Sequence, residues 1–266
     1  MENSRMLRDI IDGISSKYGH LLSDNDRLFL KRVCAVSGET YRKRLDAIGF
    51  LQRGKILDAG CGFGQWSVEL ARHNPSLCAI DMQPLRLKIL AEIVEQLGLD
   101  NVETKKSRLE ELPYDDNTFD GIFCYGVISC TDWKKTLGEF ARVLKKDGIL
   151  YLTANGLGWY LNLWKNRPHE TTDYNPRENA ALSFWNTTEY EATGKPPARA
   201  HIIIEVEEMT EAIKERGLTL LEQGGEGTIC INKNSCRPEP FFSGTYFGEV
   251  GVYEIVATKK KAGEGR

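Results

Sequence analysis

Short runs of apolar residues alternate with segments of helical period through the middle of the chain. The apolar runs are residues 55–59, 77–81, 119–125 and 149–154, and residues 101–105 are a further expected strand between the second and third of them. The helical segments between them are residues 65–73, 84–97 and 133–144, the last with Asp132 at its N-cap. Strands that are apolar on both faces and alternate with helices are typical of a parallel sheet covered on both sides. The pattern therefore predicts a doubly wound α/β domain.

The segments on either side of this core have different patterns. Residues 1–50 have helical periodicity and predict an N-terminal helical extension to a domain that covers residues 51–260. A helix over 206–216 and strands over 218–221 and 251–258 are expected to complete that domain. Two stretches lack a sustained period and predict insertions, namely residues 155–200, interpreted as a lid, and residues 224–249. We expect residues 261–266 to be a flexible tail.

The composition argues against several classes of partner. The 266 residues carry a net charge of −3, so no overall basic field attracts nucleic acid. The seven cysteines form no CxxC pair, which indicates reduced thiols rather than disulfides or a zinc site. No run approaches the roughly 18 apolar residues of a membrane helix. We expect a cytoplasmic protein, a monomer or a homodimer, with no metal and no membrane contact.

A glycine-rich turn follows the first predicted strand. Gly60, Gly62 and Gly64 stand where a side chain would block the approach of a ligand to the backbone. Asp81 ends the next strand, at the spacing of about 20 residues from which a carboxylate reaches ribose hydroxyls. The third glycine is one place too early for the dinucleotide pattern, and Asp58 at the mouth of the site would repel a pyrophosphate. A ligand with an ammonium and a sulfonium fits better, which favours S-adenosylmethionine over a nicotinamide dinucleotide.

Four segments, in order, resemble the motifs of the class I S-adenosylmethionine-dependent methyltransferase family. Residues 58–64 (DAGCGFG) resemble its first motif, residues 79–82 (AIDM) its second, residues 110–120 the segment before the fourth strand, and residues 141–148 the turn into the fifth. The resemblance covers residues 50–154. It implies a Rossmann-like, mostly parallel sheet of seven strands with the last strand antiparallel, S-adenosylmethionine as the cofactor, and methyltransferase activity.

The resemblance also assigns roles around the cofactor. The first motif would line the methionine portion, with a carboxylate near its amino group. The acid that ends the second strand would hold both ribose hydroxyls, and the next residue would pack on the adenine. The cofactor-binding residues implied in this way are Asp58, Gly60, Cys61, Gly62, Asp81, Met82, Arg108, Leu109 and Tyr125. Arg108 is a departure, because many members carry an acid there for the adenine amino group. Ser107 or a backbone carbonyl would take that role, or the register is shifted by one.

Methyl transfer from a sulfonium is an in-line displacement with an activated leaving group. The enzyme therefore mainly aligns the acceptor, excludes water and, where needed, removes a proton. His169, inside the predicted lid, is the candidate general base, and a loop histidine with no catalytic role is the alternative. The candidate acceptor-binding residues are Tyr125, Gly126, Trp159, Tyr160 and Trp164. The three aromatic residues of the lid could equally form its own core.

The acceptor is less constrained than the cofactor. The fourth strand ends in FCYG rather than the Asn/Asp-Pro-Pro-Tyr used by amino methyltransferases of nucleic-acid bases, which argues against DNA. A small-molecule or sugar-containing, glycan-type acceptor is expected first, and an RNA such as tRNA second. Two other classes stay open: a nucleotide-cofactor oxidoreductase, and a non-catalytic protein that binds S-adenosylmethionine.

Overall fold

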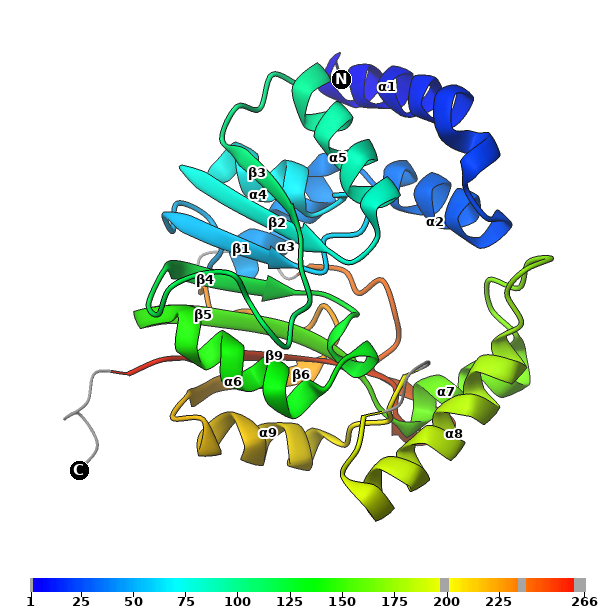
Figure 1. Ribbon diagram of the computed structural model, residues 1–266, viewed down its shortest axis with the longest axis vertical. Helices are drawn as coiled ribbons and strands as arrows, with labels where there is room; N and C mark the ends of the chain where they lie inside the picture. The colour runs from blue at the N-terminus through cyan, green and yellow to red at the C-terminus, as the bar shows by residue number, and fades with distance from the viewer. Residues whose placement is uncertain (1, 197–200, 234–237, 261–266) are drawn as a thin grey trace.

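A seven-stranded sheet lies between two layers of helices in the computed structural model, which describes residues 2–196, 201–233 and 238–260 (Figure 1). Its strands are β1 (Lys55–Ala59), β2 (Ser76–Asp81), β3 (Val102–Lys106), β4 (Phe119–Cys124), β5 (Leu144–Asn155), β6 (Thr219–Gly225) and β9 (Val252–Thr258). Their order is β3-β2-β1-β4-β5-β9-β6. Only β9 runs antiparallel to its neighbours, β5 and β6, and the other pairs are parallel. The predicted fold class is confirmed. The predicted tail, 261–266, lies outside the described residues.

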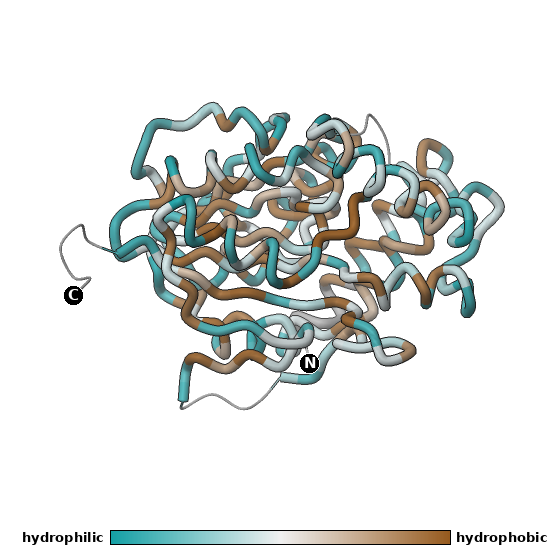
Figure 2. The backbone as a smooth tube through the Cα atoms, turned by 90° about the horizontal axis from the view of Figure 1, so that it is seen from below, coloured by the Kyte–Doolittle hydropathy of each residue, from teal (hydrophilic) through white to brown (hydrophobic). Residues whose placement is uncertain are grey.

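Helices cover both faces of this sheet because its central strands are apolar on both sides. On one face lie α3 (Gly38–Ala47), α4 (Ser67–His73) and α5 (Pro84–Gln96), and on the other α6 (Trp133–Val143) and α9 (Val206–Glu215). In β2, Leu77 and Ala79 face the first layer, whereas Cys78 and Ile80 face the second. Figure 2 shows the hydrophobic residues concentrated along these central strands. The predicted N-cap is confirmed, because Asp132 accepts a hydrogen bond from the Lys135 amide.

The N-terminal helices extend the first layer. They are α1 (Glu2–Tyr18) and α2 (Asp24–Ala35), joined by the short 3₁₀ helix η1 (Gly19–Leu21). Ile14 and Leu30 are buried against Ile89 and Ile93 of α5. Ser23 caps α2 by accepting a hydrogen bond from an amide of its first turn. α2 therefore has a fixed position next to the carboxyl ends of the central strands.

The insertion after β5 is more regular than the sequence pattern suggests. It forms α7 (Leu157–Asn166) and α8 (Pro176–Thr193), which pack against each other beyond the end of the sheet (Figure 1). The lack of a sustained apolar period has a physical reason, because α8 buries small residues, Ala180 and Ser183, and leaves Leu182 and Trp185 exposed. Its apolar residues therefore do not mark its buried face.

The second expected insertion begins after β6, which extends to Gly225. Its described part ends in a hairpin formed by β7 (Thr245–Tyr246) and β8 (Glu249–Val250). This hairpin contacts α7, so the two insertions meet. Within the part of the chain that the structure describes, no helix is long and apolar enough to cross a membrane.

Candidate active site

The glycine turn between β1 and α4 is closely packed by neighbouring side chains. Gly60 has φ of +83° and Gly64 has φ of +86°, conformations that favour glycine. A Cβ at Gly60 would lie 2.6 Å from a methyl carbon of Val127. The Gly60 and Cys61 amides both donate to the carbonyl of Ile80 at the end of β2, at 2.8 and 2.9 Å. The loop therefore requires glycine and is tied to the neighbouring strand.

Asp81, the last residue of β2, ties the glycine loop after β1 to the end of β2. Its Oδ2 accepts a hydrogen bond from the Gly62 amide at 3.0 Å, and its Oδ1 accepts one from the Gln83 amide at 2.8 Å. The side chain is 9% exposed and lines a cavity. A carboxylate held in this way at a strand end is well placed to accept hydrogen bonds from the hydroxyls of a ligand.

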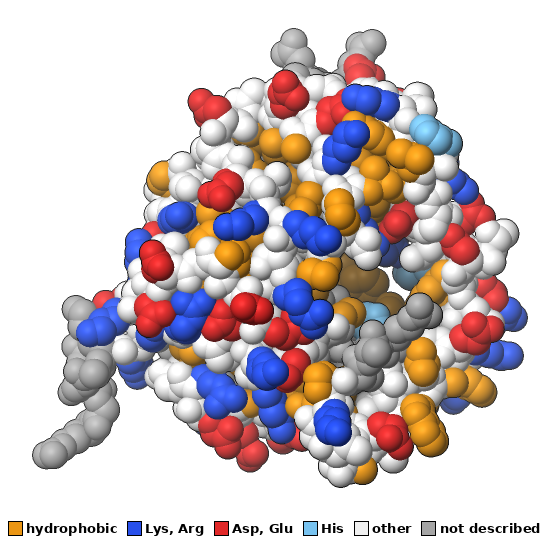
Figure 3. All heavy atoms as spheres, viewed as in Figure 1, with side chains coloured by type: hydrophobic (Ala, Val, Ile, Leu, Met, Phe, Trp, Pro, Cys, Tyr) orange, Lys and Arg blue, Asp and Glu red, His pale blue; other side chains and the backbone are white. Residues whose placement is uncertain are grey.

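A cavity of about 600 Å³ lies at the carboxyl ends of the central strands. This volume is typical of sites that enclose a small molecule. The wall formed by the core domain includes Gly60, Gly62 and Asp81, and the wall formed by the insertions includes Trp159 and Tyr160. Figure 3 shows the surface hollowed beside α7 and α8, with hydrophobic and histidine side chains at the hollow. The glycine loop and the insertion after β5 therefore face one shared space.

This cavity brings together about half of the site residues expected from the sequence. Those that line it are Gly60, Gly62, Asp81, Tyr125, Gly126, Trp159, Tyr160 and His169. Those that do not line it are Asp58, Cys61, Met82, Arg108, Leu109 and Trp164. Met82 and Trp164 are each 46% exposed. Arg108 is exposed and forms an ion pair with Glu110, so its side chain does not reach the cavity.

Asp58 lies behind the glycine loop rather than at the mouth of the site. It is 2% exposed, and its Oδ2 accepts a hydrogen bond from the Ser67 hydroxyl at 2.6 Å. Burial raises the pKa of Asp58 to about 7, with a further contribution from Asp81 and an opposing one from Ser67. The expectation that Asp58 stands at the mouth and repels a pyrophosphate is therefore wrong. Its carboxylate is too deeply buried for that role.

Several cavity residues have no signal in the sequence pattern. Phe29 and Arg32 of α2 line the cavity, as do Asn155 at the end of β5 and Phe241 in the second insertion. In the sequence, Phe29 and Arg32 belong to a helix whose period is explained by packing alone. Only the position of α2 above the glycine loop gives them access to the site.

Two histidines face the cavity. His169, from the loop between α7 and α8, was expected there, and His201 was not. Burial lowers the pKa of both imidazoles, and the nearby Arg32 guanidinium lowers that of His169 further. A ring nitrogen of His201 lies 3.2 Å from the Cys130 sulfur. Both rings are therefore neutral at neutral pH and able to accept a proton.

Tyr125 is anchored by a buried charged network behind the cavity. Its hydroxyl donates to Glu226 at 2.8 Å, and Glu226 forms an ion pair with Arg44. Arg44 also lies 3.5 Å from Glu254, which accepts a hydrogen bond from the Tyr151 hydroxyl. Glu226 accepts two further backbone hydrogen bonds from residues 241 and 242. The network thus connects α3, β5, β9, the residue after β4 and the second insertion at the wall of the site.

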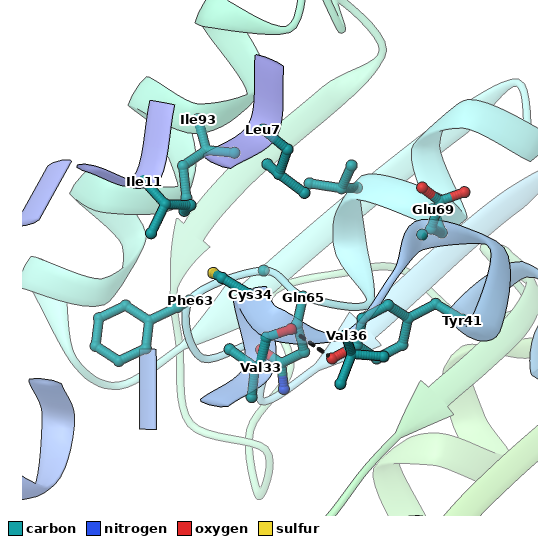
Figure 4. Close-up of a pocket in the computed structure, with 13 residues that line it drawn as sticks. Leu7, Ile11, Val33, Cys34, Val36, Tyr41, Phe63, Gln65, Glu69 and Ile93 are labelled. Atoms are coloured by element: carbon teal, nitrogen blue, oxygen red, sulfur yellow. Dashed lines mark hydrogen bonds between the residues drawn. The ribbon is translucent and has the colours of Figure 1, made fainter. Parts of the chain in front are cut away.

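A much smaller cavity lies between the N-terminal helices and α4 (Figure 4). Leu7, Ile11 and Ile93 surround it, and the Tyr41 hydroxyl beside it donates to the Val33 carbonyl at 3.0 Å. Its volume of about 30 Å³ admits two or three water molecules at most, by the usual estimate of about 10–15 Å³ each. It is a packing defect rather than a ligand site. Among the described residues, no cluster of His, Cys, Asp and Glu has the arrangement of a metal site.

Comparison with known proteins agrees with this geometry. Residues 56–148 match a family model described as "Methyltransferase domain". A demethylmenaquinone methyltransferase of Bacillus cytotoxicus is 30% identical over 53% of this chain and 59% of its own length. A tRNA (guanine-N(7)-)-methyltransferase of Christiangramia forsetii is 28% identical over 53% of this chain and 74% of its own length. The chain thus spans about three fifths of the first relative.

Solved structures show the same fold. A putative sarcosine dimethylglycine methyltransferase from Galdieria sulphuraria superposes with a TM-score of 0.60 at 18% identity, covering 90% of this chain and 99% of that one. Geranyl diphosphate methyltransferase in complex with S-adenosylmethionine superposes with a TM-score of 0.58 at 15% identity, covering 84% and 85%. The fold and the match of residues 56–148 to a methyltransferase domain confirm the resemblance to class I S-adenosylmethionine-dependent methyltransferases found in the sequence.

Proposed function

We propose that the protein transfers the methyl group of S-adenosylmethionine to a small-molecule acceptor held in the 600 Å³ cavity. One observation carries this proposal: the glycine loop and Asp81 share that cavity with the aromatic residues of the lid, Trp159 and Tyr160. A donor bound at the loop and an acceptor bound under the lid would lie side by side. Alignment of this kind supplies most of what an in-line displacement requires.

The residues of the core domain fit the cofactor. The side-chain-free backbone at Gly60 and Gly62 would lie along its methionine portion, and Asp81 would accept hydrogen bonds from its ribose. Asp58, behind the loop, would act on the cofactor's ammonium through the electrostatic field and not by direct contact. The bound cofactor would supply an activated methyl group. Tyr125 and Gly126 form the adjoining cavity wall, where the acceptor would approach.

Removal of a proton from the acceptor, where one is needed, would fall to a histidine. His169 is our first candidate, because it lies on the lid and lines the cavity. His201 is the second, with the Cys130 thiol as its neighbour. Their neutral state suits either as a general base. The lid would also exclude water from the reacting groups.

The wall of the cavity favours a compact acceptor over a polynucleotide. Of the described arginines and lysines, only Arg32 and Arg86 line it, and Arg86 is paired with Asp26 at 2.6 Å. A demethylmenaquinone methyltransferase among the relatives also acts, by its name, on a small molecule. Sugar-containing acceptors are included in the proposal. The tRNA methyltransferase among the relatives makes tRNA the second candidate, although a site with so few cations offers little to a phosphate backbone.

The test is a transfer assay with S-adenosylmethionine carrying a labelled methyl group. Purified protein is incubated with phenols, carboxylic acids, amines and sugar conjugates, and in a parallel arm with total tRNA. We expect S-adenosylhomocysteine to form in stoichiometric amount with one labelled small-molecule product, and Asp81→Ala to abolish most of this turnover. If only the tRNA becomes labelled, the acceptor is RNA and not a small molecule. Cofactor binding without turnover in any arm would favour a non-catalytic protein.

A further inference from the structure

Arg32 is a cation of the cavity wall without an acidic partner. It belongs to the last turn of α2 and lines the cavity. Within the described residues, it forms no ion pair or hydrogen bond, and its contact is a cation–π interaction with Phe29, whose ring centre lies 5.5 Å away. Burial lowers the pKa of its guanidinium, which means that the charged form has lost hydration without gaining a counter-ion. Arginine nevertheless stays protonated at neutral pH.

The other charges of the cavity do not neutralise Arg32. Asp81 is the one carboxylate among the described residues that line the cavity, and both of its oxygens already accept backbone hydrogen bonds. Arg86 has its own partner in Asp26. The electrostatic neighbours of Arg32 are the phenol groups of Tyr41, Tyr125 and Tyr174, which are uncharged at neutral pH. The wall thus presents one positive charge that no other described group of the protein balances.

We propose that Arg32 binds a carboxylate inside the cavity. A planar guanidinium can hold a carboxylate through two parallel hydrogen bonds, and partial burial strengthens such a pair. This inference rests on the proposed function, because that function defines which carboxylates enter the site. They are the carboxylate of the cofactor's methionine portion and a carboxylate on the acceptor.

Arg32 is placed where it could reach either carboxylate, that of the cofactor or that of the acceptor. Phe29, one helical turn earlier on α2, lies 3.8 Å from the position that a Cβ on Gly62 would occupy. Arg32 is therefore close to the loop that would hold the methionine portion. Arg32 also lowers the pKa of His169, and both residues line the same cavity, so Arg32 also lies near the loop between α7 and α8. The two sources are separated by experiment.

Isothermal titration calorimetry on wild type, Arg32→Gln, Arg32→Lys and Lys31→Gln makes this separation. Lys31 is the matched control, because it precedes Arg32 on α2, is exposed and lies outside the cavity wall. The probes are S-adenosylhomocysteine, which carries the methionine-type carboxylate, and 5′-methylthioadenosine, which lacks the amino-acid portion. Benzoate, titrated with and without saturating S-adenosylhomocysteine, stands for an acidic acceptor.

If the carboxylate is the cofactor's, Arg32→Gln weakens S-adenosylhomocysteine about tenfold to a hundredfold and leaves 5′-methylthioadenosine unchanged. If the carboxylate is the acceptor's, Arg32→Gln binds both adenosine probes with wild-type affinity and no longer binds benzoate. Arg32→Lys loses less affinity than Arg32→Gln, because it keeps the positive charge. Lys31→Gln binds every probe with wild-type affinity. Unchanged binding of all three probes by Arg32→Gln would overturn the inference, as would an equal loss for both adenosine probes, which indicates a structural role. If wild type binds neither adenosine probe, the proposed function fails, and benzoate binding to the free protein still reports on Arg32.

Discussion

Asp58 is buried without a cation partner among the described residues, so replacing it tests the electrostatics of the site directly. Its pKa is raised from 3.8 to about 7, chiefly by burial. A shift of this size corresponds to a cost on the order of 4 kcal/mol for keeping the group ionised in the folded protein. A carboxyl whose folded pKa is raised binds more protons folded than unfolded. Its contribution to stability is therefore complete below the unfolded pKa and is lost as the pH rises toward 7.

Asp58→Asn removes this loss, because the amide cannot ionise and its oxygen can still accept from the Ser67 hydroxyl. The difference in free energy of unfolding between Asp58→Asn and wild type should grow in favour of the variant by about 2–3 kcal/mol between pH 5 and pH 8. Urea unfolding of the ligand-free protein at several pH values measures it. Comparing pH values cancels any constant cost of fitting the amide.

Asp100→Asn is the control, because Asp100 is exposed. A difference between Asp58→Asn and wild type that stays constant from pH 5 to pH 8 would refute the assignment of a raised pKa to Asp58. Saturating S-adenosylhomocysteine should reduce the pH dependence of wild type, since its ammonium group would stabilise the ionised carboxylate. This effect links the buried acid to the cofactor.

Three further substitutions test other parts of the site. Asp81→Ala should weaken S-adenosylhomocysteine by about 1–3 kcal/mol in calorimetry, the cost of losing charge-assisted hydrogen bonds, and an unchanged affinity would contradict the ribose assignment. Arg44→Met should lower the free energy of unfolding by about 3–5 kcal/mol, because Glu226 would stay buried without its cation, and a loss below about 1 kcal/mol in urea unfolding would contradict this account. His169→Ala should abolish the acid limb of the pH–rate profile, which should lie below the ordinary pKa of 6.5 because burial lowers that of His169. An intact limb in that variant, with its loss in His201→Ala, would make His201 the base.

The sheet and the cofactor loop were predictable because their signals are local. The strands β1, β2, β4 and β5 contain apolar runs, and the turn at Gly60 and Gly64 must be glycine for reasons visible in a few residues. Asp81 followed from its place at the end of the second strand. In each case a short segment is sufficient to determine its own conformation.

The lid helix α8 was missed for a physical reason. Its buried side carries Ala180 and Ser183, while Trp185 is 63% exposed, so hydrophobicity does not mark the packed face. The usable signals were at its ends, where Pro176 occupies the first turn and Gly194 ends the helix in the left-handed conformation. Proline and glycine would have predicted this helix where the apolar period did not.

Contacts between distant segments account for the remaining surprises. The hydrogen bond from Tyr125 to Glu226 joins residues 101 positions apart. The access of Arg32 to the cavity depends on how α2 lies against the core domain, which no local pattern records. The burial of Asp58 follows from the packing of Ser67 and the loop above it. Such features require the three-dimensional arrangement of the chain.

Calorimetric titration of the purified protein with S-adenosylmethionine, S-adenosylhomocysteine and NADH tests the central claim most directly. The account predicts saturable binding of the first two ligands, with a stoichiometry of one per chain, and none of NADH. It also predicts that Gly60→Val, which places a side chain against Val127, abolishes this binding. An absence of heat with both adenosylated ligands, or saturable binding of NADH in their place, would contradict the account.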